Sequence, residues 1–197
     1  MHLFKKQLEK PQGYIGGLIG WMMDQNNEER SKYTLSKLQV GPHDQLLEVG
    51  FGSGRTLAKV QQLLADGGKV VGVDHSEIMY QKAIQLNRVA IAQGKVELYC
   101  KCLWDFNTLE EHYDTVYASN VHEFWQNPIT EFRFMRELLR VGGKLVIVFQ
   151  LQGLKSLAIE QAIEQAKAQF MAAGFDRIES DYQKLKTATC ISVIGYK

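Results

Sequence analysis

The sequence predicts an α/β fold built on a doubly wound, mostly parallel sheet. Two apolar runs support this prediction: residues 46–49, which contain an acid and lead into three alternating glycines, and residues 70–74, which end in a second acid. A segment compatible with a helix, residues 55–65, separates the two runs. Strand-like and helix-like segments then alternate along the rest of the chain, which is typical of parallel strands joined by helices.

The three alternating glycines predict a ligand-binding turn, because turns at the carboxyl ends of parallel strands form the crevice of open α/β sheets. Gly50 and Gly52 can adopt backbone angles closed to other residues and let a ligand approach the main chain. Gly54 lies where the following helix begins, so that unpaired N–H groups there can face a ligand carboxylate. Asp74 follows by about 20 residues, the separation at which a second-strand carboxylate reaches a ribose.

Two further strands and two further helices are predicted. Residues 95–99 and 113–121 predict the third and fourth strands. Residues 76–92 predict a helix capped by Ser76, with an acid in its first turn. An alanine- and glutamine-rich helix over residues 156–173 is expected to end at Gly174.

A single domain is expected from these elements and from the length of 197 residues. Residues 1–44 combine apolar positions with a polar run and end in a Gly-Pro turn, so we expect one or two helices that form an N-terminal cap. Residues 45–197 form the predicted cofactor-binding core.

Charge and cysteine content narrow the function further. The net charge of +1 gives no reason to expect a nucleic-acid partner or an anionic membrane surface. The three cysteines are odd in number and lack metal-ligand spacing, so we expect reduced thiols, no metal site and a cytoplasmic location. Residues 1–10 do not resemble a signal peptide, and no apolar stretch is long enough for membrane insertion.

The glycine spacing distinguishes between two kinds of adenosine ligand. A dinucleotide fingerprint would read G-x-G-x-x-G/A, but the sixth position is Arg55 or Leu57, depending on the frame. The pattern E-x-G-x-G-x-G over residues 48–54 instead resembles the first motif of the class I S-adenosylmethionine-dependent methyltransferases.

Later segments resemble the same family in the same order, over nearly the whole chain. They are the leader at residues 11–16 and 22–27, the F-W-x-N-P run at 124–128, the helix, Gly-Gly turn and fifth strand over 135–147, with the turn at 142–143, and the final strand at 190–196. The resemblance implies a Rossmann-like, seven-stranded sheet with a reversed C-terminal strand. It is closest to small, single-domain members that act on small molecules.

The resemblance also implies the reaction. A methyl group passes from S-adenosylmethionine to a small-molecule acceptor by in-line displacement, which leaves S-adenosylhomocysteine. The carbon is already activated, so the protein mainly orients the reactants, an effect that can contribute about 7–11 kcal/mol. A general base matters only if the acceptor retains its proton near neutral pH.

The resemblance assigns cofactor contacts residue by residue. The positions are Glu48, Gly50, Phe51, Gly52, Gly54, Asp74, His75, Met79, Cys102, Leu103, Asn120 and Val121. Glu48 is expected near the methionine amino group, and Asp74 at the ribose, although a helix-capping role is the alternative for Asp74. Cys102 stands where the family usually has a polar residue that holds the adenine amine. We therefore expect the Leu103 backbone and packing against Trp104 to hold adenine.

The acceptor side is assigned to the turn after the fourth strand and to the N-terminal cap. His122 is the candidate general base because histidine titrates near neutrality, with an ordinary polar loop residue as the alternative. Tyr14, Met22, Asn26 and Glu123 are the candidate substrate-binding residues. Since residues 150–156 are too few for a lid, the cap is expected to form the roof.

Two alternatives remain open at this stage. A methyltransferase acting on protein or nucleic acid is disfavoured by the neutral charge and by the absence of N-P-P-Y after the fourth strand, where residues 120–123 read N-V-H-E. A non-catalytic S-adenosylmethionine-binding protein is disfavoured by the intact glycines and Asp74, but Cys102 keeps it open. The acceptor and the oligomeric state cannot be predicted from the sequence.

Overall fold

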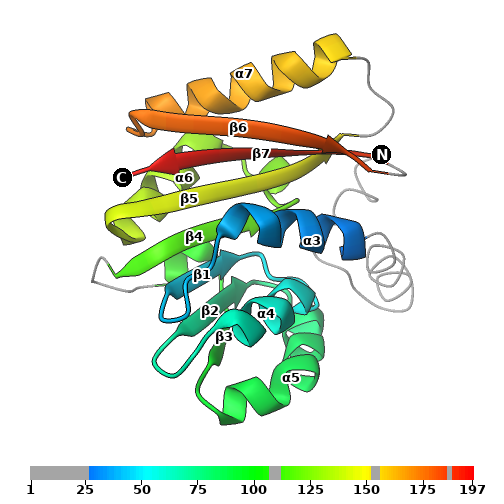
Figure 1. Cartoon of the computed structure of the whole chain (residues 1–197), viewed down its shortest axis with the longest axis vertical. Helices are drawn as coiled ribbons and strands as arrows, with labels where there is room; N and C mark the ends of the chain where they lie inside the picture. The colour runs from blue at the N-terminus through cyan, green and yellow to red at the C-terminus, as the bar shows by residue number, and fades with distance from the viewer. Residues whose placement is uncertain (1–26, 107–111, 152–155, 186–187) are drawn as a thin grey trace.

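A computed structural model describes residues 27–106, 112–151, 156–185 and 188–197, and a seven-stranded sheet lies at its centre (Figure 1). The strands are β1 (Gln45–Val49), β2 (Lys69–Asp74), β3 (Val96–Cys100), β4 (Tyr113–Ser119), β5 (Leu139–Leu151), β6 (Arg177–Lys184) and β7 (Thr189–Tyr196). Their order is β3-β2-β1-β4-β5-β7-β6. β7 is antiparallel to both of its neighbours, β5 and β6. All the pairs formed among the first five strands are parallel. The predicted fold is confirmed.

Helices cover both faces of this sheet. The α-helices are α3 (Asn27–Leu38), α4 (Arg55–Val60), α5 (Glu77–Ala92), α6 (Pro128–Leu138) and α7 (Ser156–Ala172). Two apolar cores result, one under α3, α4 and α5 and the other under α6 and α7. Successive strand residues point to opposite cores: in β1, Leu46 belongs to the first and Leu47 to the second. Both faces are therefore buried, as the apolar strand runs require.

Two predicted elements differ in detail from the structure. The helix predicted over residues 55–65 ends at Val60 and continues as the 3-10 turn Gln61–Leu63, after which the Ala65 N–H donates to the Pro42 carbonyl at 2.7 Å. The predicted Gly-Gly turn at 142–143 was wrong, because both glycines lie inside β5. Gly142 has a φ of 79° there, and the pairing with β4 shifts register between Tyr113 and Thr115.

Two other predicted boundaries, at Ser76 and Gly174, agree closely with the structure, whereas α6 begins at Pro128, well before residue 135. α5 begins after Ser76, whose hydroxyl oxygen accepts from the Met79 N–H at 3.5 Å. α7 is followed by Gly174, with a φ of 95°. Within the described residues, no helix combines the length and the apolar character needed to cross a membrane.

α3 is the described part of the predicted N-terminal cap. Its Tyr33 hydroxyl donates to the Asp181 carbonyl and lies 3.0 Å from the Ser192 hydroxyl, so the helix is attached to β6 and β7. Ser31 and Thr56 also share a hydrogen bond of 3.1 Å, which attaches α3 to α4. Residues 1–26 lie outside the described part, so the rest of the cap stays a prediction.

Candidate functional site

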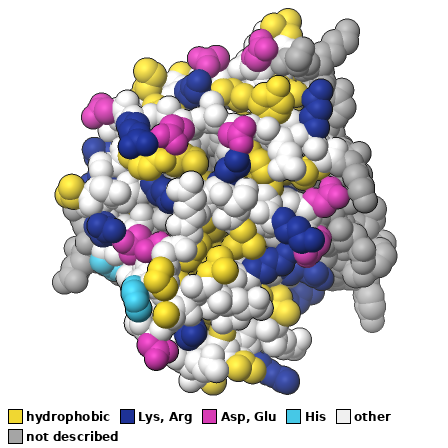
Figure 2. All heavy atoms as spheres, in the orientation of Figure 1, with side chains coloured by type: hydrophobic (Ala, Val, Ile, Leu, Met, Phe, Trp, Pro, Cys, Tyr) yellow, Lys and Arg dark blue, Asp and Glu magenta, His cyan; other side chains and the backbone are white. Residues whose placement is uncertain are grey.

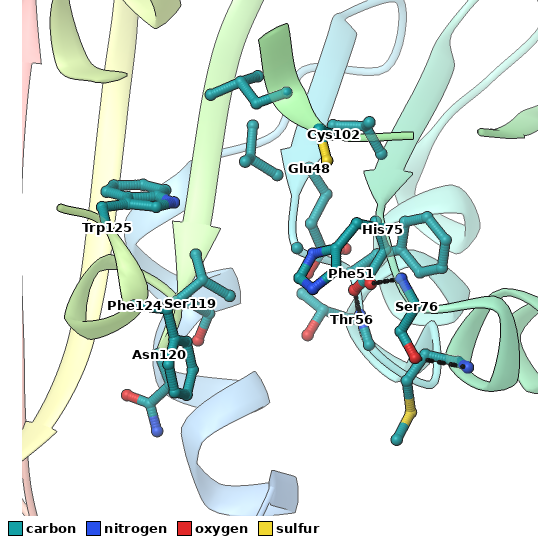
Figure 3. Close-up of a pocket in the computed structure, with 18 of the residues that line it drawn as sticks. Glu48, Phe51, Thr56, His75, Ser76, Cys102, Ser119, Asn120, Phe124 and Trp125 are labelled. Carbon is teal, nitrogen blue, oxygen red and sulfur yellow. Dashed lines mark hydrogen bonds between the residues drawn. The ribbon is translucent and has the colours of Figure 1, made fainter. Parts of the chain in front are cut away.

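A cleft of about 580 Å³ opens at the carboxyl ends of the parallel strands. Its lining comes from the turn after β1, the end of β2, the segment after β3, the turn after β4, and α3. Figure 3 shows Phe124 and Trp125 on one side of this cleft and Phe51 and His75 on the other. This is the edge of an open α/β sheet where ligands bind.

The predicted glycine turn forms one wall, and two of its glycines have distinct roles. Gly52, with a φ of 55°, has open space where a side chain would begin. Gly54, with a φ of 77°, is packed so closely that an added Cβ would stand 2.7 Å from Asn87 Nδ2. Gly52 therefore leaves space for a ligand, and Gly54 allows α4 and α5 to approach each other.

Asp74 joins the glycine turn to the end of β2. Its carboxylate accepts hydrogen bonds from the Gly52 N–H at 2.8 Å and from the Ser76 N–H at 2.9 Å. Burial raises the pKa of this carboxyl, and the two backbone donors oppose the rise. The α5 cap itself is Ser76, so the alternative role predicted for Asp74 does not apply. His75 and Met79 follow, half-buried, and line the same cleft.

Glu48 lies deeper in the cleft and is only 2% exposed. The Tyr117 hydroxyl donates to its Oε2 at 3.0 Å. Burial raises the pKa of Glu48 to about 8, opposed by the Tyr117 hydrogen bond and by the charge of Arg30. A cationic ligand group beside this carboxyl would stabilise its ionised form.

A hydrogen-bonded cluster lies on the α3 side of the cleft. Gln150 Oε1 accepts from Arg30 Nη1 at 3.1 Å and from Asn120 Nδ2 at 2.9 Å, and the Gln150 N–H donates to Asn120 Oδ1 at 2.9 Å. Asn120 has a φ of 56°, a conformation that asparagine tolerates better than most residues. Sequence reasoning found Asn120 but missed Arg30 and Gln150, whose partners are far apart in the chain.

The segment after β3 provides the opposite end of the cleft. Cys102 is exposed and Leu103 is buried in the 3-10 turn Leu103–Asp105. The Trp104 ring, half-exposed, packs against Phe134 of α6 with ring centroids 5.0 Å apart. All three residues named for this end of the cleft (Cys102, Leu103 and Trp104) line it, as do Phe51 and Val121.

The structure does not bring His122 into this cleft. It lines a second cavity of about 280 Å³ between α6, α7 and β5, where its ring lies 4.6 Å from that of Phe149. Burial lowers the pKa of His122 to about 4, and its Nδ1 has no hydrogen-bond partner among the described residues. The expectation that His122 faces an acceptor at the cleft mouth is therefore not supported.

The predicted acceptor-binding residues lie outside what the structure describes. Tyr14, Met22 and Asn26 precede the described part of the chain, and the side chain of Glu123 is not described. The cleft instead contains Trp125 and Glu131, which sequence reasoning did not select. Among the described residues, no group of three His, Cys, Asp or Glu side chains could hold a metal ion.

Fold and cleft together define an α/β protein that binds a small molecule at the edge of its sheet. The model of the methyltransferase domain family matches residues 47–145, half of the chain, and the chain belongs to this family. It is an S-adenosylmethionine-dependent methyltransferase.

Individual proteins show similarity over different shares of the chain. The uncharacterized methyltransferase YdaC of Bacillus subtilis is 27% identical over 187 residues, which cover 91% of this chain and 98% of that one. The tRNA U34 carboxymethyltransferase of Shewanella frigidimarina is 34% identical over 103 residues, which cover 52% of this chain and 30% of that one.

Solved structures support the fold alone. The [4+2]-cyclase SpnF has a TM-score of 0.71 at 14% identity, over 87% of this chain and 82% of that one. An S-adenosylmethionine-dependent methyltransferase from Aquifex aeolicus has a TM-score of 0.70 at 15% identity, over 84% of this chain and 88% of that one.

Proposed function

We propose that this methyltransferase acts on a small-molecule acceptor. The observation that supports the proposal is the cleft itself, whose volume of about 580 Å³ lies within the range of small-ligand pockets. Its aromatic and polar lining includes Trp125 and Glu131 in addition to the residues predicted for the donor.

Three features of the cleft fit the donor. Gly52 leaves open space beside the main chain, and Ser119 Oγ is buried with no hydrogen-bond partner among the described residues. The Glu48 carboxyl and the Arg30 guanidinium both line the cleft. In this proposal, Glu48 binds the methionine ammonium group and Arg30 the carboxylate, while Asp74 binds the ribose hydroxyls.

S-adenosylmethionine supplies an activated methyl carbon bound to a positively charged sulfur. The acceptor's lone pair forms the new bond to that carbon as the carbon–sulfur bonding pair moves to sulfur, which becomes a neutral thioether. The protein holds the two reactants in line and excludes water, an effect that can contribute about 7–11 kcal/mol. No step uses His122, which lies in the second cavity.

A tRNA acceptor is the second candidate, because one relative named above is a tRNA carboxymethyltransferase. The net charge of +1 argues against it, since tRNA binding depends on clustered cations. Figure 2 shows both Lys and Arg and Asp and Glu distributed over the face that it draws.

One experiment separates the two acceptors. The purified protein is incubated with a donor labelled in its methyl group and either the low-molecular-weight fraction of a cell extract or total tRNA. We expect label in a small molecule, and much less label with Asp74→Ala, which should weaken donor binding. Label in acid-precipitable tRNA would refute the small-molecule proposal, and S-adenosylhomocysteine calorimetry tests donor binding separately.

A further inference from the structure

Glu131 is a buried carboxylate in the cleft that the proposed mechanism leaves unused. It lies near the start of α6 and is 8% exposed. Its Oε2 has no hydrogen-bond partner in the described part of the chain, and burial raises the pKa of the carboxyl. Since an unpaired buried carboxylate oxygen is costly, a ligand that donates a hydrogen bond there would gain affinity.

Aromatic contacts fix the end of the cleft to which Glu131 belongs. Phe134 lies three residues further along α6, hence on the same side of the helix, and packs on Trp104. Phe132, the next residue, packs on Trp125 with ring centroids 5.7 Å apart. This turn of α6 therefore contacts both tryptophans that line the cleft.

The two ends of the cleft differ in chemistry. The cluster of Arg30, Asn120 and Gln150, which provides the charged end, lies beside the ends of β4 and β5, whereas Cys102 and Trp104 follow the edge strand β3. In Figure 3, Cys102 and Trp125 lie in the upper part of the view and Asn120 in the lower part. With the ribose at Asp74 on β2, an amino-acid group fits the charged end and a flat base fits the aromatic end.

We propose that the Glu131 carboxylate accepts a hydrogen bond from the exocyclic amine of the donor's adenine. A carboxylate can only accept, and this amine is the hydrogen-bond donor that the base offers. The residue thus supplies from α6 the acidic group that the end of β3 lacks, where Cys102 stands. The inference rests on the proposed placement of the donor in this cleft.

The test compares S-adenosylhomocysteine with its 6-deamino analogue, in which purine replaces adenine. Calorimetry on the full chain should show that the wild-type protein prefers the amine-bearing ligand by about tenfold to a hundredfold, the usual effect of a hydrogen bond to a charged group. In Glu131→Leu the preference should fall to about one. Glu131→Gln, which keeps the shape of the side chain, should show an intermediate ratio.

A matched control is Glu137→Leu, which removes a carboxylate from the same helix, outside the cleft, and should leave the ratio unchanged. A full preference retained by Glu131→Leu would overturn the inference and leave the proposed function intact. The inference would also fail if the variant lost only acceptor turnover, because Glu131 would then face the acceptor. If the wild-type protein bound neither ligand, the donor placement itself would be wrong.

Discussion

The Tyr117 hydroxyl donates a hydrogen bond of 3.0 Å to Glu48 Oε2 between two neighbouring strands. Glu48 and Tyr117 are direct partners in the parallel register of β1 and β4, and both are buried. Burial raises the pKa of Glu48 to about 8, while the phenol stabilises the ionised form. At neutral pH the free protein therefore holds a proton that a bound cation would displace.

Binding of S-adenosylhomocysteine at pH 7 should release a proton from Glu48. The proposed ammonium neighbour lowers the pKa of the carboxyl, so the proton leaves when the ligand binds. Calorimetry in two buffers of different ionisation enthalpy measures this release, which should be absent in Glu48→Gln. Equal proton release by the wild-type protein and the variant would contradict the placement of the ammonium group beside Glu48.

The same carboxyl makes stability depend on pH. Its folded pKa of about 8 lies above the ordinary value of 4.5, so the folded state binds more protons than the unfolded state between those values. The contribution of Glu48 to the free energy of unfolding therefore falls as pH rises through that window. Urea titrations of the ligand-free protein should show a steeper fall than in Glu48→Gln, and parallel curves would contradict this.

The contribution of His122 to the free energy of unfolding should depend on pH in the opposite direction. Burial lowers its folded pKa from 6.5 to about 4, so the unfolded state binds more protons in that window and stability is lost as pH falls through it. His122→Leu should remove this loss. It should also stabilise the protein by about 1 kcal/mol at neutral pH, because it removes an unpaired buried nitrogen. Urea titrations at both ends of the window measure each effect.

Asp74→Ala should weaken S-adenosylhomocysteine binding by about tenfold to a hundredfold, since it removes the proposed ribose contact and the carboxylate that holds the Gly52 N–H. Calorimetry gives the affinity. 5′-Methylthioadenosine, which retains the ribose but lacks the amino-acid group, should lose affinity to the same extent. If only S-adenosylhomocysteine lost affinity, Asp74 would not contact the ribose.

Arg30→Leu should give the complementary result. The variant removes the cation proposed to bind the methionine carboxylate, so S-adenosylhomocysteine should bind about tenfold more weakly. Methylthioadenosine, which lacks the carboxylate, should bind as before. Parallel losses for both ligands would mean that Arg30 acts through the packing of α3.

Gly54→Ala and Gly52→Ala should separate stability from binding. In the first variant the methyl group meets Asn87 and Ala83 in a left-handed backbone conformation, so it should cost about 3 kcal/mol of stability. In the second the methyl group enters open space, so it should cost about 1 kcal/mol but reduce donor affinity. Urea titration measures the stability of both variants, and calorimetry measures their donor affinity. Equal stability losses in the two variants would contradict the prediction.

The sequence allowed prediction of the features that depend on local backbone chemistry. The glycine turn, Asp74 and the Ser76 cap lie where their spacing indicated, because each is determined by a few neighbouring residues. Arg30 and Gln150 could not be found in this way, since 120 positions separate them and only the packing of α3 near β5 brings them together.

Two residues show why local signals can mislead. His122 follows Asn120 closely, which suggested a place in the cleft, but the 3-10 turn His122–Phe124 brings its ring against Phe149 instead. Glu131 lies in the first turn of α6, where an acid favours the helix dipole. Sequence reasoning did not select it, because the burial of its side chain depends on tertiary packing.

The attachment of α3 through Tyr33 has a consequence for the order in which the protein is made. A ribosome releases α3 early, but the hydroxyl partners of Tyr33 belong to β6 and β7, which emerge much later. Because α3 also supplies Arg30 and Ser31 to the cleft, the hydrogen bonds of Tyr33 can fix that wall only after β6 and β7 have paired. A nascent chain therefore lacks the Tyr33 attachment of the proposed donor site until β7 has been synthesised.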